Sequence, residues 1–233
     1  MLFLLALPLL SVGALASRKL IIKNECSFEI WPAVLNTFSD GGYSGPRGWH
    51  AKPGSSKTVT VPEHWNGRAW ARRGCSFDSK GKGSCLSGDC GGGLECEDAT
   101  MGWANLFEVN LESYAGQDCA TPFVSSFSLL TPRSVNPLLV WDISAVPGFN
   151  VPMSVVPGDS SCDAVVCSKD LLATCPKELR VYDSDGKTVI NCLSACMADI
   201  YGIGGKFDNS MNCCAGQYNS LEKCVSSKVD YYE

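Results

Sequence analysis

Fourteen cysteines in 233 residues constrain this chain more than any other feature of its sequence. Cysteine at this density is typical of exported chains that fold around disulfides in an oxidising compartment. Zinc is the competing interpretation of Cys192-x3-Cys196 and of the adjacent Cys213 and Cys214. However, both histidines lie far away in sequence, and the spacing is not the paired Cys-x2-Cys pattern of zinc sites. We therefore expect disulfides, with no metal and no cofactor.

The number of cysteines does not choose their partners, because fourteen of them allow on the order of 10^5 pairings. Backbone geometry does restrict how two cysteines that are adjacent in the sequence can pair. Adjacent Cα atoms lie about 3.8 Å apart, whereas the Cα atoms of a relaxed disulfide lie roughly 4.4–6.8 Å apart. Cys213 and Cys214 should therefore reach in different directions.

The first sixteen residues are an apolar run that ends in Ala14-Leu15-Ala16. The run is too short to span a bilayer, and its small-residue end predicts a secretory signal cleaved after Ala16, although the usual positive charge at its start is missing. The alternative is a buried strand or helix. A net charge of -5 without a basic run argues against nucleic acid and against anionic membranes as partners. We expect a secreted, extracellular monomer with no stable membrane anchor.

Alternating apolar and polar residues predict a mainly β chain. We expect strands over 19–35 (two strands, broken near Asn24 and Pro32), 56–62, 67–73, 106–113 and 141–156 (two strands around Pro147-Gly148). Residues 74–96 are dense in Gly and Cys, which predicts loops held by sulfur bridges. One short helix is expected near 192–201, where Cys192, Cys196 and Ile200 fall on one helical face. The pattern predicts an antiparallel β-sandwich with a disulfide-rich lobe over 162–224.

A cysteine-rich motif at 67–96, GRAWARRGCSFDSKGKGSCLSGDCGGGLEC, closely resembles the thaumatin-like family of pathogenesis-related group 5 type. Five other stretches agree with that family in the same order: NECSFEIWPA (24–33), LFEVNL (106–111), WDISAVPGFNVPMSVVP (141–157), CPKEL (175–179) and CLSAC (192–196). The family usually has Thr where this chain has Ser87. The resemblance implies one domain over 17–233, a flattened antiparallel β-sandwich with disulfide-bound lobes.

The resemblance also implies five disulfides. The expected pairs are Cys75 with Cys85, Cys90 with Cys96, Cys175 with Cys192, Cys196 with Cys213, and Cys214 with Cys224. Cys26, Cys119, Cys162 and Cys167 remain. In the family, the positions of Cys26, Cys162 and Cys167 pair with cysteines of a C-terminal segment that this sequence lacks, so we expect the C-terminal strands to be missing.

Residues 119–140, an apolar stretch rich in Ser and Pro, are absent from the family pattern. They are either a genuine surface loop or the product of a translated intron or an erroneous gene model. An apolar loop is poorly suited to solvent. The partner of Cys119 stays open.

Many plant members of the family have an acidic cleft with one Arg, one Glu and three Asp. The resemblance places the Glu at Glu108 and one Asp at Asp142; Met101 and Pro147 occupy the positions of the Arg and a second Asp, and the last Asp lies in the absent segment. Two carboxyl groups are the minimum for glycoside hydrolysis, one as proton donor and one to stabilise or attack the oxocarbenium-like centre. Glu108 would be the better acid if burial raises its pKa. The alternative is that both are simply outward polar residues on strands.

Sugar rings stack on exposed aromatic faces, and Trp103 and Tyr43 are candidates because turn-rich polar residues surround them. The alternative is that they pack in the core. No Gly-x-Ser-x-Gly and no phosphate loop occurs in the sequence. The leading hypothesis is a secreted defence, antifungal or cell-wall protein that binds β-1,3-glucan, with weak endo-β-1,3-glucanase activity from Glu108 and Asp142. The alternatives are a non-catalytic carbohydrate binder, an inhibitor of another enzyme, or an inactive truncated product.

Overall fold

The computed structural model describes residues 17–37, 42–98, 103–111, 140–158, 163–200, 207–220 and 222–228. The predicted signal at 1–16 lies outside these ranges, as do Met101, Cys119, Cys162 and all but the last residue of the predicted insertion. Across the described ranges, no helix is both long and apolar enough to cross a membrane.

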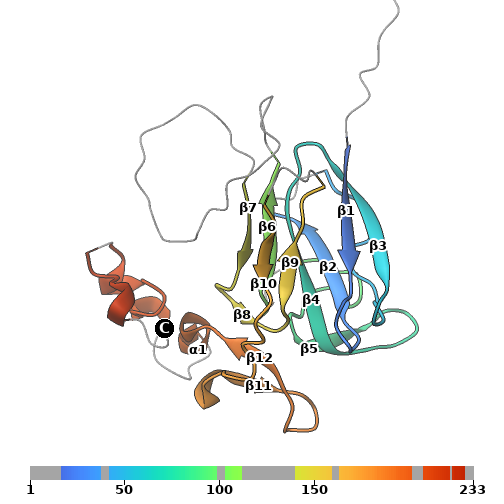
Figure 1. The fold of residues 1–233 in the computed structure, drawn as a ribbon. Coiled ribbons are helices and arrows are strands. Elements are labelled where there is room, and N and C mark those ends of the chain that lie inside the picture. Colours follow the sequence, from blue (N-terminus) through green and yellow to red (C-terminus); the bar gives the residue numbers. More distant parts are fainter. Residues whose placement is uncertain are drawn as a thin grey trace, which may run out of the picture.

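The central element of the fold is an antiparallel sheet with the strand order β2-β4-β6-β7 (Figure 1). Its strands are β2 (Trp31–Asn36), β4 (Asn66–Phe77), β6 (Leu106–Asn110) and β7 (Val140–Ser144). A further strand, β5 (Gly83–Ser87), forms a hairpin with the distal end of β4. Every pairing in this sheet is antiparallel, so each strand presents alternate side chains to two opposite faces.

Two short antiparallel ribbons cover one face of the central sheet. One pairs β1 (Ser17–Lys23) with β3 (Ser56–Pro62), and the other pairs β9 (Met153–Val155) with β10 (Val165–Cys167). The buried core between the layers takes side chains from the central sheet and the ribbons: Val34, Ala69, Val109, Trp141, Val59 and Val61, with Leu20, Ile22, Val155 and Val165 packed against them. The predicted mainly β, antiparallel sandwich is confirmed.

A disulfide-rich lobe follows the sandwich along the chain (Figure 1, orange to red). Its small sheet has the order β11-β12-β8, from β11 (Arg180–Tyr182), β12 (Val189–Leu193) and β8 (Gly148–Phe149). Its helical elements are α1 (Ala195–Ile200) and the 3-10 helices η1 (Lys177–Leu179), η2 (Phe207–Asn209), η3 (Gly216–Tyr218) and η4 (Ser226–Lys228). Cys175, Leu179, Leu193 and Ala198 form its own small core.

Among the described residues, the structure forms all five disulfides that the family resemblance implies. They join Cys75–Cys85, Cys90–Cys96, Cys175–Cys192, Cys196–Cys213 and Cys214–Cys224. The two adjacent cysteines thus serve separate bridges, one to α1 and one along the C-terminal turn. Within the described part of the chain, Cys26 and Cys167 form no disulfide, and both are half-buried.

Three local expectations need correction. Pro32 does not break a strand but lies within β2, which tolerates proline because it is the edge strand of the sheet. Residues 74–96 are not all loop, because β4 continues to Phe77 and pairs with β5, bringing Cys75 directly opposite Cys85. The helix begins at Ala195; the segment before it forms β12, which pairs with β11 and β8 on its two sides.

Candidate functional site

Both predicted carboxylates lie on the face of the central sheet that points away from the sandwich core. In β6, Phe107 and Val109 face that core, so the alternation turns Glu108 to the opposite side. Strand register places Arg68 of β4 directly opposite Glu108, and Glu108 directly opposite Asp142 of β7. Directly opposed residues in an antiparallel pair have Cβ atoms about 4.5–5.5 Å apart. The fold therefore aligns one cation and two acids across three neighbouring strands.

The three side chains interact, but not all of their polar atoms are satisfied. Arg68 Nε lies 3.9 Å from Glu108 Oε1, a long ion pair whose side chains are 25% and 38% exposed. Among the described residues, Asp142 Oδ1 and Arg68 Nε are buried and have no hydrogen-bond partner. Buried polar atoms without partners are costly and are uncommon in folded proteins. Asp142 Oδ1 can accept a hydrogen bond from a polar ligand, and Arg68 Nε can donate one.

Electrostatics distinguish the two carboxyl groups. Burial raises the pKa of Asp142, and the neighbouring charge of Glu108 raises it further. Glu108 is the carboxyl beside the Arg68 cation. Asp142 is therefore suited to keep a proton. The expectation that Glu108 is the better acid stays a prediction.

Neither of the two aromatic residues predicted to stack on sugar lies in the row formed by Arg68, Glu108 and Asp142. Tyr43 is only 6% exposed, and its hydroxyl donates a 2.6 Å hydrogen bond to the Pro46 carbonyl from within the sandwich core. The expectation that Tyr43 offers an exposed face for a sugar is therefore wrong, because the sandwich core covers its ring. Trp103 is half-buried and packs against the small core of the lobe. A role for Trp103 in binding sugar stays a prediction.

Arg68 is the residue of this site that sequence reasoning missed. The resemblance placed the cleft arginine at the position of Met101, which lies outside the described residues. The signal that was present was the run GRAWARR, in which arginines recur along one strand. Locating Arg68 beside Glu108 requires the register between β4 and β6, because the two residues are forty positions apart.

The described residues contain no group of three or more His, Cys, Asp or Glu side chains that could hold a metal ion. The side chains of the site offer chemistry of their own. They can donate a proton, accept hydrogen bonds from hydroxyl groups, and stabilise a positive centre.

Known proteins resemble this chain along most of its length. A pathogenesis-related thaumatin-like protein 3.5 of Cryptomeria japonica is 36% identical over 207 residues, covering 88% of this chain and 72% of that protein. A glucan endo-1,3-beta-glucosidase of Prunus avium is 34% identical over 224 residues, covering 94% and 79%. Pathogenesis-related protein 5 of Arabidopsis thaliana is 32% identical over 213 residues, covering 91% and 75%.

Among solved structures, a thaumatin-like xylanase inhibitor aligns with a TM-score of 0.41 and 29% identity, covering 64% of this chain and 81% of that one. The family model described as "Thaumatin family" matches residues 24–233, which is nearly all of the chain. The antiparallel sandwich and the disulfide-rich lobe agree with that match, and this protein belongs to the thaumatin family.

Proposed function

We propose that this protein is a secreted defence, antifungal or cell-wall protein that binds β-1,3-glucan and hydrolyses it weakly as an endo-β-1,3-glucanase. The observation that carries the proposal is the direct opposition of Glu108 and Asp142 on β6 and β7. The name of the Prunus avium relative, a glucan endo-1,3-beta-glucosidase, supports the substrate class. The five disulfides support an extracellular location, because such bonds persist in oxidising compartments.

In this proposal the two carboxyl groups have different roles. Asp142, whose pKa burial raises, donates a proton to the leaving glycosidic oxygen. Glu108 acts as the carboxylate that faces the oxocarbenium-like centre, and Arg68 holds it in place. Retaining enzymes have their carboxyl groups about 5–5.5 Å apart and inverting enzymes about 6.5–9.5 Å apart. Direct opposition across one strand pair favours the shorter separation and hence retention.

The test is a reducing-sugar assay on laminarin with Glu108→Gln and Asp142→Asn. General acid–base catalysis contributes about 10²–10⁴-fold, so each variant should lose at least ~100-fold in kcat/KM. The matched control is Glu178→Gln, because Glu178 is an exposed carboxyl on η1 in the lobe. Its activity should equal that of the unmodified protein. Unchanged activity in Glu108→Gln removes the enzymatic part of the proposal.

A non-catalytic binder is the second candidate, and one observation favours it. Arg68 lies beside Glu108, so the pair can donate to and accept hydrogen bonds from sugar hydroxyl groups without any bond being broken. Sedimentation with insoluble β-1,3-glucan separates the candidates. A binder would be retained on the glucan, release no reducing sugar, and lose retention when Arg68 is changed to Gln.

A further inference from the structure

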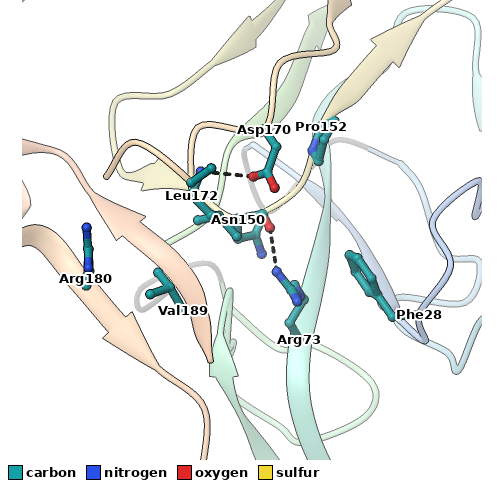
Figure 2. Close-up of a pocket in the computed structure, with 9 residues that line it drawn as sticks. Phe28, Arg73, Asn150, Pro152, Asp170, Leu172, Arg180 and Val189 are labelled. Carbon is teal, nitrogen blue, oxygen red and sulfur yellow. Dashed lines mark hydrogen bonds between the residues drawn. The ribbon is translucent and has the colours of Figure 1, made fainter. Parts of the chain in front are cut away.

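A pocket of about 410 Å³ lies between the sandwich and the lobe, and it includes none of Arg68, Glu108 and Asp142 (Figure 2). Four parts of the chain line it: the β1–β2 loop, β4, the segment from β8 to β9, and the lobe from 170 to 189. Its volume falls within the range of about 300–1,000 Å³ that is usual for ligand sites. The side chains around it determine which chemistry it accepts.

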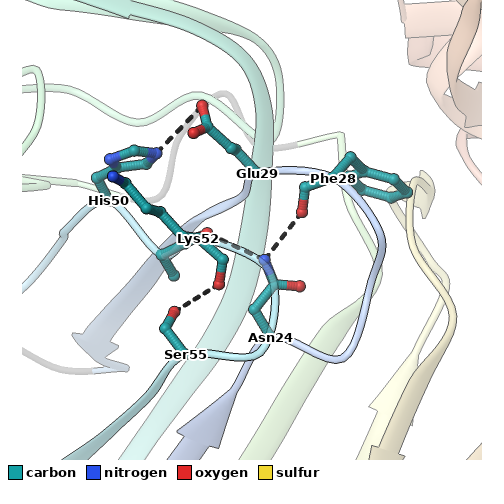
Figure 3. A network of polar contacts seen from close by, with 7 residues as sticks. Asn24, Phe28, Glu29, His50, Lys52 and Ser55 are labelled. Atoms are coloured by element: carbon teal, nitrogen blue, oxygen red, sulfur yellow. Dashed lines mark hydrogen bonds and ion pairs between the residues drawn. The ribbon is translucent and has the colours of Figure 1, made fainter.

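Arg73 of β4 is fixed in one wall of this pocket. Its Nη1 donates to the backbone carbonyl of Asn150 at 3.1 Å, as Figure 2 shows, and its guanidinium carbon lies 4.2 Å from the Phe28 ring centroid. Asn24 fixes Phe28 in turn, by donating a 2.9 Å hydrogen bond to the Phe28 carbonyl (Figure 3). The guanidinium is therefore held before any ligand arrives, which lowers the entropic cost of binding.

No described carboxylate forms an ion pair with Arg73. Burial lowers the pKa of Arg73, while the nearby Cys26, Asp183 and Asp170 act in the opposite direction. One edge of the guanidinium binds Asn150, and its other donors remain for a ligand. A half-buried guanidinium fork of this kind fits a carboxylate in a bidentate manner.

A second arginine and one acid complete the polar lining. Arg180 of β11 uses its Nε to bind the Cys175 carbonyl at 2.8 Å, which leaves both terminal nitrogens available. Asp170 accepts a 3.0 Å hydrogen bond from the Leu172 amide through Oδ1 only. Its second oxygen can accept a hydrogen bond from a hydroxyl, and its charge repels a dianionic phosphate or sulfate more strongly than a carboxylate monoanion. Val189, Pro152 and Leu172 supply apolar contacts between these groups (Figure 2).

We propose that this pocket binds a hydroxylated carboxylate, and specifically a short oligosaccharide of uronic acid residues. The acid group binds Arg73, a second acid or hydroxyl binds Arg180, and a ring hydroxyl donates to Asp170. The apolar C–H faces of the sugar rings lie against Pro152 and Val189. This site is independent of the proposed glucan site, since the two share no side chain.

The test is calorimetric titration with a galacturonic acid trimer, with laminaritriose as the neutral probe of the same length. The acidic trimer should bind at least ~10-fold more tightly than the neutral one, because a charge-assisted bidentate contact is roughly twice as strong as a neutral hydrogen bond. Arg73→Lys keeps the positive charge but loses the forked guanidinium, so it should weaken binding of the acidic trimer about 10-fold. Arg47→Gln, a guanidinium deletion outside the pocket, should change nothing.

Arg180→Gln provides a second variant in case Arg73→Lys disturbs folding, and thermal melting of each variant reports whether it folds. Glu108→Gln should leave binding of the acidic trimer intact, which separates this site from the proposed glucan site. Equal binding of the acidic and neutral trimers would overturn the proposal. Binding of inorganic sulfate as tightly as the acidic trimer would also overturn it. Undiminished binding of the acidic trimer by both folded arginine variants would do the same. Binding of malate as tightly as the trimer would refute the oligosaccharide class.

Discussion

Replacing Arg72 with methionine should destabilise this protein more than any other single arginine substitution. Arg72 is 0% exposed, although it carries a charge. Its guanidinium donates to three backbone carbonyls: Trp31 at 3.0 Å, Gly93 at 2.8 Å and Leu94 at 2.7 Å. Two of these bonds join β4 to the loop that the Cys90–Cys96 disulfide closes, and the third joins it to β2.

Two opposing terms set the magnitude. Hydrogen bonds to a charged group contribute about 1.5–3 kcal/mol each, so three contribute roughly 4.5–9 kcal/mol before desolvation. Burial lowers the pKa of Arg72 from 12.5 to about 10. At about 1.36 kcal/mol per pKa unit, that desolvation costs roughly 3 kcal/mol. The two terms differ by about 1.5–6 kcal/mol. Because methionine removes both and keeps part of the apolar stem, the net loss should lie inside that range, at about 2–4 kcal/mol.

Scanning calorimetry under non-reducing conditions measures this loss. In a chain of this size, 1 kcal/mol corresponds to about 2–4 °C in Tm, so we expect a fall of roughly 5–15 °C. Arg47→Met is the matched control, because the Arg47 guanidinium makes no hydrogen bond or ion pair to described residues. A loss below about 0.5 kcal/mol for Arg72→Met, the range of ordinary surface substitutions, would refute the argument.

Three further predictions follow from the same structure. Asp142→Asn should raise the Tm near neutral pH, because the raised pKa of Asp142 in the folded state means that its ionised form is destabilising there. This gain in Tm should disappear as the pH falls below 3.8, the ordinary pKa of the group. A gain that persists below that pH would contradict the prediction. Ellman titration of the native protein should be slow and should complete on denaturation, because Cys26 and Cys167 are half-buried free thiols; a mass map that shows them disulfide-bonded would contradict this. Gly48→Ala should unfold the molecule at lower temperature, because its Cβ would collide with the Leu94 carbonyl oxygen; a Tm within a degree of the parent's would count against the packing described there.

Much of the fold could be predicted from short stretches of the chain. SKTVTVP alternates strictly and forms β3 with the expected bounds, because a half-buried strand has a period of two residues. The prediction for residues 74–96 was less accurate: their Gly and Cys content suggested loops, yet β5 forms there. Pairing with β4 outweighs local composition, since each strand satisfies the backbone of the other.

The candidate site, too, could be predicted from the sequence only in part. The sequence supplied Glu108 and Asp142 through family resemblance, but it did not supply their environment. Burial raises the pKa of Asp142, and the register of β4 brings Arg68 opposite Glu108. Tyr43 was misjudged for a related reason: its polar sequence neighbours lie outside the core, whereas its own ring lies inside it.

The cross-link chemistry, the family and most of the strand segments could be predicted from the sequence, because each of these depends on residue types at short spacing. Which distant side chains meet depends on the three-dimensional packing of the chain. Arg68, Glu108 and Asp142 form one row, and Arg73, Asp170 and Arg180 line one pocket, because strands and loops far apart in the chain pack together. Proximity and burial of this kind arise from non-local pairing, which no local pattern encodes.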